Sequence, residues 1–230
     1  MKTAVLVDGA YFIIKARHIY GILTPRDLIS KLLLGVQHHL HNKNGERYSQ
    51  LYRIFFYDCP PLNKKMEHPL THKQIDYGKS DRAKWRNELH DELRKTPHVA
   101  LRLGAVDDVN CSWVIDSDKL KKLCRGTVQV SDLVENDIKI NAKQKGVDMR
   151  LGVDVASLAY KKQVDRIVLI AGDSDFVPAA KLARREGIEF VLDPMWSPIK
   201  GDLQEHIDIL RSGFPKPNHD KKHDVETDNS

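Results

Sequence analysis

The chain has 230 residues, of which 41% are hydrophobic and 30% are charged, and its formal net charge is +5. This composition is typical of one well-buried globular domain and excludes a fibrous or largely disordered protein. No stretch is apolar for long enough to span a bilayer and no signal peptide precedes the first strand-like run, so we expect a cytoplasmic protein without a membrane partner. Three cysteines without a Cys-x-x-Cys pair indicate free thiols rather than a zinc site.

The first half of the chain alternates strand-like and helix-like patterns. In order, it predicts a strand, a helix, a strand, a helix and a strand, at Lys2–Asp8, Asp27–His41, Leu51–Asp58, Asp81–Arg94 and Val99–Leu103. The polar stretch from Pro60 to Gly78 is typical of a surface loop.

The segment near 104–144 is the least regular part of the chain. Trp113–Ile115 and Thr127–Val130 are candidates for a hairpin, and Lys119–Arg125 for a basic helical turn or a solvated loop. Beyond it, an apolar stripe predicts a helix that follows Gly146. A strand, a helix and a strand are then expected, at Arg166–Ala171, Phe176–Glu186 and Gly187–Leu192.

Alternating strands and helices predict an α/β fold of the three-layer, Rossmann-like kind. We expect a mostly parallel five-stranded sheet in the order 3-2-1-4-5, with helices on both faces. Residues 1–212 would form a single domain with the less predictable insert near 104–144. The tail at 213–230 has almost no apolar residue and is expected to be disordered.

Aspartates follow several of the apolar runs. Asp8 ends the first predicted strand, and Asp173 with Asp175 follow the fourth. In the order 3-2-1-4-5 these strands are neighbours at the reversal of strand order, where open α/β sheets bind ligands. The helix that begins near Asp148 precedes the fourth strand, so its first turn can lie at the same edge. Carboxylates this close favour a hard divalent cation, Mg²⁺ or Mn²⁺.

Each of these acids also has an alternative role as a helix cap, and this applies most to Asp148. Asp154 is a secondary candidate, because six helical residues rotate it by about 120° from the Asp148 face. Asp58 ends the second predicted strand, away from the reversal, and is left out of the candidate site. The acids near residues 107–118 are interpreted as solvated loop charges.

Four motifs occur in a characteristic order: Val7-Asp8-Gly9, Phe55-Phe56-Tyr57-Asp58, Lys145-Gly146-Val147-Asp148 and Gly172-Asp173-Ser174-Asp175-Phe176. Over most of residues 1–195 the chain resembles an NYN domain of the LabA-like group within the PIN-like nuclease superfamily. The resemblance implies a Rossmann-like, PIN-like fold and a metal-dependent ribonuclease centre. It assigns metal binding and catalysis to the four acids, Asp8, Asp148, Asp173 and Asp175, and suggests that Ser174 arranges the site or the substrate.

The chain departs from the family pattern at one position. Family members commonly carry asparagine three residues after the first aspartate, where this chain has Tyr11. Tyrosine can hydrogen-bond a phosphate or stack on a base, but it cannot replace the contact of an amide.

The basic residues that flank Asp148 are candidates for contact with backbone phosphates. They are Lys143, Lys145 and Arg150, and the alternative for each is an ordinary solvated helix face. The net positive charge also mildly favours an anionic partner. The expected partner is therefore RNA, preferentially single-stranded, and the oligomeric state stays open, with a homodimer as one option.

Two functions of different classes remain. The first is a ribonuclease that hydrolyses phosphodiester bonds with a metal-activated water. The second is a nucleic-acid-binding regulatory module of the same fold that has lost turnover, for which Tyr11 is the main support. A phosphatase with an aspartate nucleophile ranks below both, because the first strand lacks an Asp-x-Asp motif.

Overall fold

A parallel sheet forms the centre of the molecule in the computed structural model, which describes residues 1–42, 44–199 and 201–217. Its six strands are β1 (Lys2–Asp8), β2 (Gln50–Asp58), β5 (Val99–Leu103), β10 (Arg166–Ile170), β11 (Glu189–Asp193) and β12 (Ile209–Leu210). They lie in the order β12-β11-β10-β1-β2-β5, and every neighbouring pair is parallel. The α/β fold class and the order of the five predicted strands are confirmed. The sixth strand, β12, was not predicted, because two residues are too short a run to show a strand pattern.

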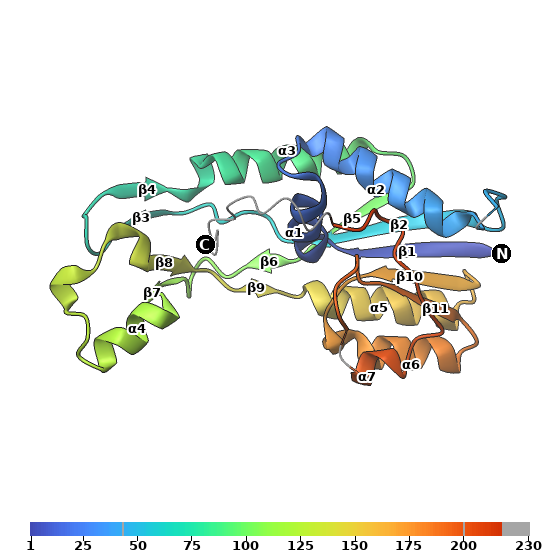
Figure 1. Cartoon of the computed structure of the whole chain (residues 1–230). Coiled ribbons are helices and arrows are strands. Elements are labelled where there is room, and N and C mark those ends of the chain that lie inside the picture. Colours follow the sequence, from blue (N-terminus) through green and yellow to red (C-terminus); the bar gives the residue numbers. More distant parts are fainter. Residues whose placement is uncertain (43, 200, 218–230) are drawn as a thin grey trace.

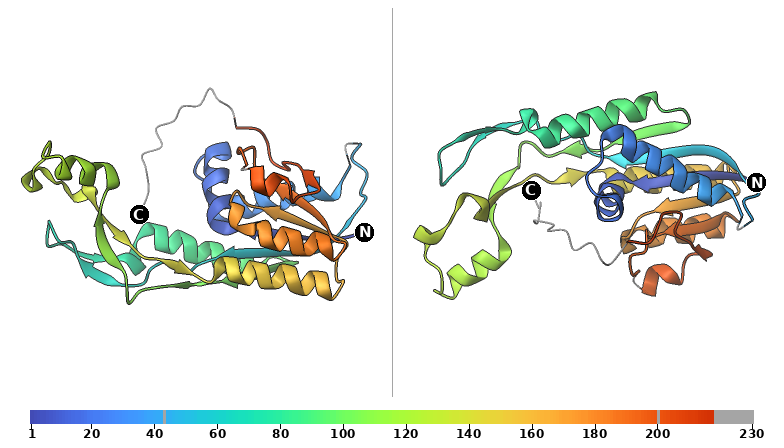
Figure 2. Two further views of the ribbon diagram at one scale, coloured as in Figure 1. Left: turned by 90° about the horizontal axis from the view of Figure 1, so that it is seen from below. Right: turned by 45° about the horizontal axis from the view of Figure 1, so that its top comes forward.

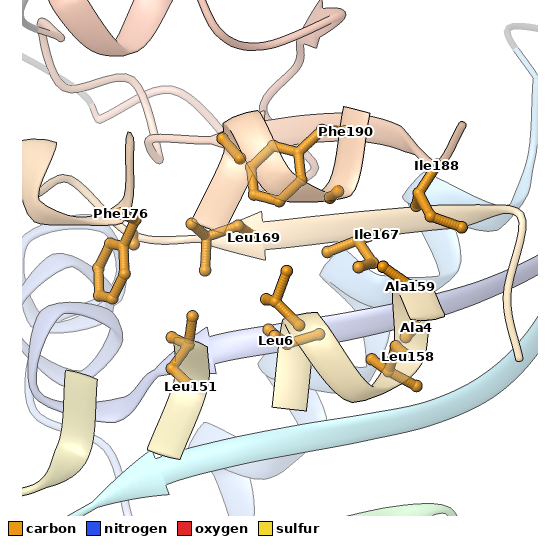
Figure 3. Packing of buried hydrophobic residues seen from close by; sticks show 14 of the residues in the cluster. Ala4, Leu6, Leu151, Leu158, Ala159, Ile167, Leu169, Phe176, Ile188 and Phe190 are labelled. Carbon is orange, nitrogen blue, oxygen red and sulfur yellow. The ribbon is translucent and has the colours of Figure 1, made fainter. Parts of the chain in front are cut away.

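Helices cover both faces of this sheet (Figure 1). One face packs against α1 (Gly9–Tyr20), α2 (Pro25–Leu40) and α3 (Asp81–Lys95), and the other against α5 (Val147–Tyr160) and α6 (Val177–Arg185). Successive residues of β1 alternate between the two faces, so that Leu6 meets one layer and Val7 the other. Figure 3 shows Leu6 packed with Leu151 of α5. Burial on both faces explains why the central strands are continuous apolar runs.

The helix α1 was not predicted from the sequence. It begins directly after β1, because the Asp8 side chain accepts a hydrogen bond from the Tyr11 backbone and caps the first turn. Its buried side chains, Phe12 and Ala16, are one helical turn apart, but apolar residues also occupy its exposed side, where Ile14 is 57% exposed. The sequence therefore shows no clear amphipathic stripe.

Two insertions project together from the sheet, and we call residues 60–80 and 104–146 the arm. It contains the strands β3 (Lys65–Glu67), β4 (Gln74–Asp76), β6 (Ala105–Val106), β7 (Ser112–Ile115), β8 (Ile138–Asn141) and β9 (Gln144–Lys145) and the helix α4 (Ser117–Cys124). Figures 1 and 2 show the arm reaching away from the end of the sheet opposite Met1. It therefore extends beyond the carboxyl ends of the strands.

The arm corrects two predictions from the sequence. The stretch 60–78 is not merely a loop, since β3 and β4 pair in it as an antiparallel hairpin. The second correction concerns the strand at residues 112–115, which pairs with residues 138–141 and not with residues 127–130. The Lys119–Arg125 segment is largely helical, within α4.

The chain after β12 packs back onto the domain. Phe214 is buried against Phe12, with ring centroids 5.6 Å apart, so the folded part continues past the predicted boundary at 212. Most of the predicted disordered tail, residues 218–230, lies outside the described residues. In the described part, no helix is both long and apolar enough to cross a membrane.

Candidate active site

Aspartates gather at the carboxyl edge of the sheet. Asp8, Asp58 and Asp193 are the last residues of β1, β2 and β11, and Asp173 follows β10 by three residues. These four strands are consecutive neighbours in the sheet. The edge is the place where parallel α/β sheets bind ligands, and what the acids can do there depends on how each one is already paired.

Two of the strand-end acids already have partners inside the protein. Asp58 is buried, accepts a hydrogen bond from His90 Nε2 at 2.7 Å, and forms an ion pair with Arg86. Asp193 is also buried and lies 2.8 Å from His39 Nε2. Buried carboxylates that are hydrogen-bonded in this way are structural. Asp58 was left out of the predicted site because of its strand position, and Asp193 was not predicted as a site residue.

Asp8 differs from these neighbours, since it has no cationic partner among the described residues. One of its oxygens accepts the Tyr11 N–H at 3.1 Å, in the cap of α1. Burial raises the pKa of Asp8 most, and the charges of Asp148 and Asp58 raise it further. Ionised Asp8 is therefore held at a cost that a bound cation would remove.

Asp148 interacts electrostatically with the three other candidate acids. It is the second residue of α5, and the helix is preceded by Gly146 at φ 79°, with no side chain capping it. The alternative role of Asp148 as a helix cap is therefore wrong. Desolvation, followed by the charges of Asp173 and Asp175, raises the pKa of Asp148. Because Asp148 also raises the pKa of Asp8, all four candidate acids lie within electrostatic reach of it.

The turn after β10 carries the two most accessible acids. Asp173 and Asp175 are exposed, and the Asp175 backbone N–H donates to Asp173 Oδ1 at 3.2 Å. Ser174 begins a short 3-10 turn, Ser174–Phe176, and its side chain lies outside what the structure describes. The turn therefore presents carboxylate oxygens to solvent.

The donors of this cluster fit a hydrated hard cation. Among the described residues, no three acidic, histidine or cysteine side chains are close enough to enclose an ion by themselves. Mg²⁺ does not need such a cage, since it keeps several water ligands and is usually held by one or two carboxylates together with substrate phosphates. Carboxylates that repel one another at an accessible edge suit that mode of binding.

Tyr11, which was expected to contact substrate, is engaged within the protein. Its hydroxyl donates to the Pro194 backbone oxygen at 2.6 Å, and burial raises its pKa. Its ring lies against Gly172, where an added Cβ would come within 2.3 Å of Tyr11 Cε2. Tyr11 therefore supports the turn that carries Asp173.

The three basic residues predicted to contact phosphates differ in whether an acidic residue of the protein already pairs with them. The Lys145 ammonium forms an ion pair with Asp107 at the base of the arm. Arg150 is exposed in the first turns of α5 and forms no salt bridge with a described residue. Lys143 is exposed just before β9. Of the three, Arg150 is the one best placed beside Asp148 to meet a phosphate.

Asp154, the secondary candidate, lies in a separate group. It accepts hydrogen bonds from Tyr57 Oη at 2.8 Å and from Arg102 Nε at 3.0 Å. Burial and the Asp154 charge raise the pKa of Tyr57, which keeps the phenol as the donor. Asp154 thus joins α5 to β2 and β5, and its charge is already paired.

Comparison with known proteins gives a family match over part of the chain. No curated protein matches the chain. A solved structure from Vibrio parahaemolyticus RIMD 2210633, described as a protein of unknown function, is 14% identical, with a TM-score of 0.48 over 93% of this chain and 94% of that one. Residues 108–206 match the family described as the NYN domain. That match supports an NYN domain protein, and the matched range holds three of the four clustered acids, Asp148, Asp173 and Asp175.

Proposed function

We propose that this chain is a divalent-metal-dependent ribonuclease of the LabA-like group of NYN domains, acting in the cytoplasm. One observation carries the proposal. At the carboxyl edge, Asp58 is paired with Arg86 and Asp193 is buried and hydrogen-bonded to His39, whereas Asp8 and the acids around Asp148 have no cationic partner among the described residues. Acids left uncompensated side by side are typical of a site that receives a cation.

The proposed ligands of Mg²⁺ or Mn²⁺ are the four clustered acids, Asp8, Asp148, Asp173 and Asp175. A metal ion bound there supplies a more acidic water and stabilises charge on a phosphoryl oxygen. The protein contributes a half-buried carboxylate, Asp8, of raised pKa, and exposed ones on the turn after β10. The exposed turn admits a flexible strand, which favours single-stranded RNA.

The proposed substrate contacts come from the two segments that flank the acids. Arg150 and Lys145 would meet backbone phosphates, and Ser174 would orient the substrate or the turn. For Lys145 this requires release from Asp107. Tyr11 contributes by supporting Gly172, and its contact with substrate is not part of the proposal.

The test is cleavage of labelled single-stranded RNA and DNA by the purified full-length chain, with Mg²⁺, with Mn²⁺ and with a chelator. Asp8→Asn and Asp173→Asn should each lower the metal-dependent rate on RNA by about 100-fold or more, the usual cost of removing one preorganised electrostatic group. Asp91→Asn, on the exposed side of α3, is the matched control and should cleave normally. Undiminished cleavage in both site variants would contradict the proposal.

A second candidate function is an RNA-binding module without turnover. The observation that favours it is Tyr11, whose hydroxyl is bound to Pro194 and which replaces the amide common in the family. It predicts that the chain retains RNA in a filter-binding assay and cleaves none of it with any divalent ion. Cleavage that depends on Asp8 would exclude it.

A further inference from the structure

We propose that the arm is a dimerisation surface and that a second copy of this chain covers it. The proposal is independent of nuclease activity. It concerns residues 60–80 and 104–146, all of which the structure describes.

The arm has secondary structure but no hydrophobic core. Within residues 104–146 no side chain is buried, and within residues 60–80 only His68 is. The two insertions are joined by side-chain contacts, among them the edge-to-face packing of His68 on Trp113 at 4.9 Å and the ion pair between Lys73 and Glu135 at 2.9 Å. Isolated two-stranded hairpins are marginally stable in water, so an arm built in this way gains its stability from a partner.

Apolar side chains are exposed along the arm. Its large exposed residues are Leu70, Val109, Val114, Leu120, Val130 and Val134, and the least exposed of them, Leu70 and Val114, are each 39% exposed. Three of them belong to the segment between β7 and β8, which contains α4. Exposed apolar side chains gathered in one projecting unit are typical of a protein interface.

The charge of the longer insertion of the arm, residues 104–146, favours a protein partner over RNA, whereas the shorter insertion, residues 60–80, carries four lysines and two acids. Residues 104–146 contain seven lysines and arginines and seven aspartates and glutamates, so their net charge is zero. Several of these charges are already paired, as in Lys119 with Asp137 and Lys121 with Asp118. Nucleic-acid binding surfaces carry a net positive charge, and this segment has none.

The shape of the arm and the charge balance of residues 104–146 fit a second copy of the same chain. In a two-fold dimer each patch faces itself, so a patch of apolar side chains with a balance of both charges is self-complementary. Residues 104–146 have this composition, since they carry five of the six exposed apolar side chains of the arm and no net charge. The arm also projects well beyond the layered domain (Figure 2), so two arms can lie together without collision of the two sheets.

The experiment is sedimentation velocity of the full-length chain between about 1 and 100 μM, the range in which interfaces of standard size assemble. The wild-type chain should approach the mass of two chains of 26.3 kDa. Leu120→Asp and Val130→Asp should each raise the dimer dissociation constant by at least about 10-fold. Ile22→Asp is the matched control, since Ile22 is 84% exposed and lies outside the arm.

A wild-type chain that stays monomeric throughout this range would overturn the proposal, as would a dimer that both arm variants leave intact. Circular dichroism of each variant checks that the domain is folded. If the arm variants lose RNA binding while the wild-type chain sediments as a monomer, the arm binds RNA and the dimer proposal is wrong.

Discussion

At the scale of the residue, the Tyr11 ring packs against Gly172, next to the turn that carries Asp173 of the candidate site. Gly172 immediately precedes Asp173, and only the lack of a side chain there lets the Tyr11 ring approach. Tyr11 also closes a hydrogen bond to Pro194, so it links the end of β11 to the turn after β10. The position of Asp173 therefore depends on a residue that the sequence presents as a substrate contact.

Replacement of Gly172 by alanine should lower the free energy of unfolding by roughly 1–3 kcal/mol, because the new Cβ overlaps the Tyr11 ring. Tyr11→Ala in the same chain should relieve the overlap, giving a favourable coupling of about 1 kcal/mol or more in a double-mutant cycle by urea denaturation. Tyr11→Phe keeps the ring and should give no relief. Equal behaviour of the two Tyr11 variants would show that the overlap is not the cause.

The raised pKa of Asp8 gives a prediction about pH. The folded chain holds the Asp8 proton more tightly than the unfolded chain, so the stability of the folded state falls as pH rises from the ordinary value of 3.8 through the raised value. Asp8→Asn lacks this penalty, and we expect its melting temperature at pH 7, in chelator, to exceed that of the wild-type chain. The difference should narrow as pH is lowered toward 3.8.

Added Mg²⁺ provides the complementary measurement. An ion that binds only the folded state raises the melting temperature, and here the gain should occur in the wild-type chain and be reduced in Asp8→Asn. Equal gains in both proteins would exclude Asp8 as a ligand.

At the scale of the element, α3 is fastened to the end of β2 through Asp58. Arg86 and His90 lie one turn apart on α3 and both bind this carboxylate. Asp58→Asn should lower the free energy of unfolding by about 3 kcal/mol, since it leaves a partly buried guanidinium without its counter-ion. Asp91→Asn, on the exposed side of the same helix, should change it little when both are measured by chemical denaturation.

The same contact shows what sequence reasoning could and could not find. The end of β2 at Asp58 was predictable from its apolar run, but its partners depend on the rotation of α3, which packing determines. In the same way, the position of Asp8 and Asp173 at the carboxyl edge of the sheet was predictable from strand order. The separation of Asp154 from these acids was predictable from its angle on the helix. The role of Tyr11 was not predictable, because it depends on a glycine 161 positions further along the chain.

The arm was the least predictable element for a related reason. Hydrophobic periodicity arises where one face of an element is buried, and residues 104–146 bury no side chain. The pairing of β7 with β8 spans an intervening helix, so no local turn signal indicates it. By contrast, β1 and β10 were predicted closely because nearly all of their residues are buried.

At the scale of the whole molecule, stability should be divided between a protected domain and an exposed arm. Amide hydrogens of β1 and β10 should exchange slowly and at similar rates, because opening them requires global unfolding. Amide hydrogens of α4, β7 and β8 should exchange orders of magnitude faster in dilute solution, since no core opposes their local opening. Hydrogen exchange followed by mass spectrometry checks both statements, and uniform protection across the chain would contradict them.

The arm is joined directly along the chain to the helix that carries Asp148 of the candidate site. Its last strand, β9, ends at Lys145, and after Gly146 the chain enters α5, whose second residue is Asp148. A ligand that shifts β9 against β6 would therefore move one carboxylate relative to Asp8, which is fixed on β1. A partner that binds the distal part of the arm would then change the distance between Asp148 and Asp8.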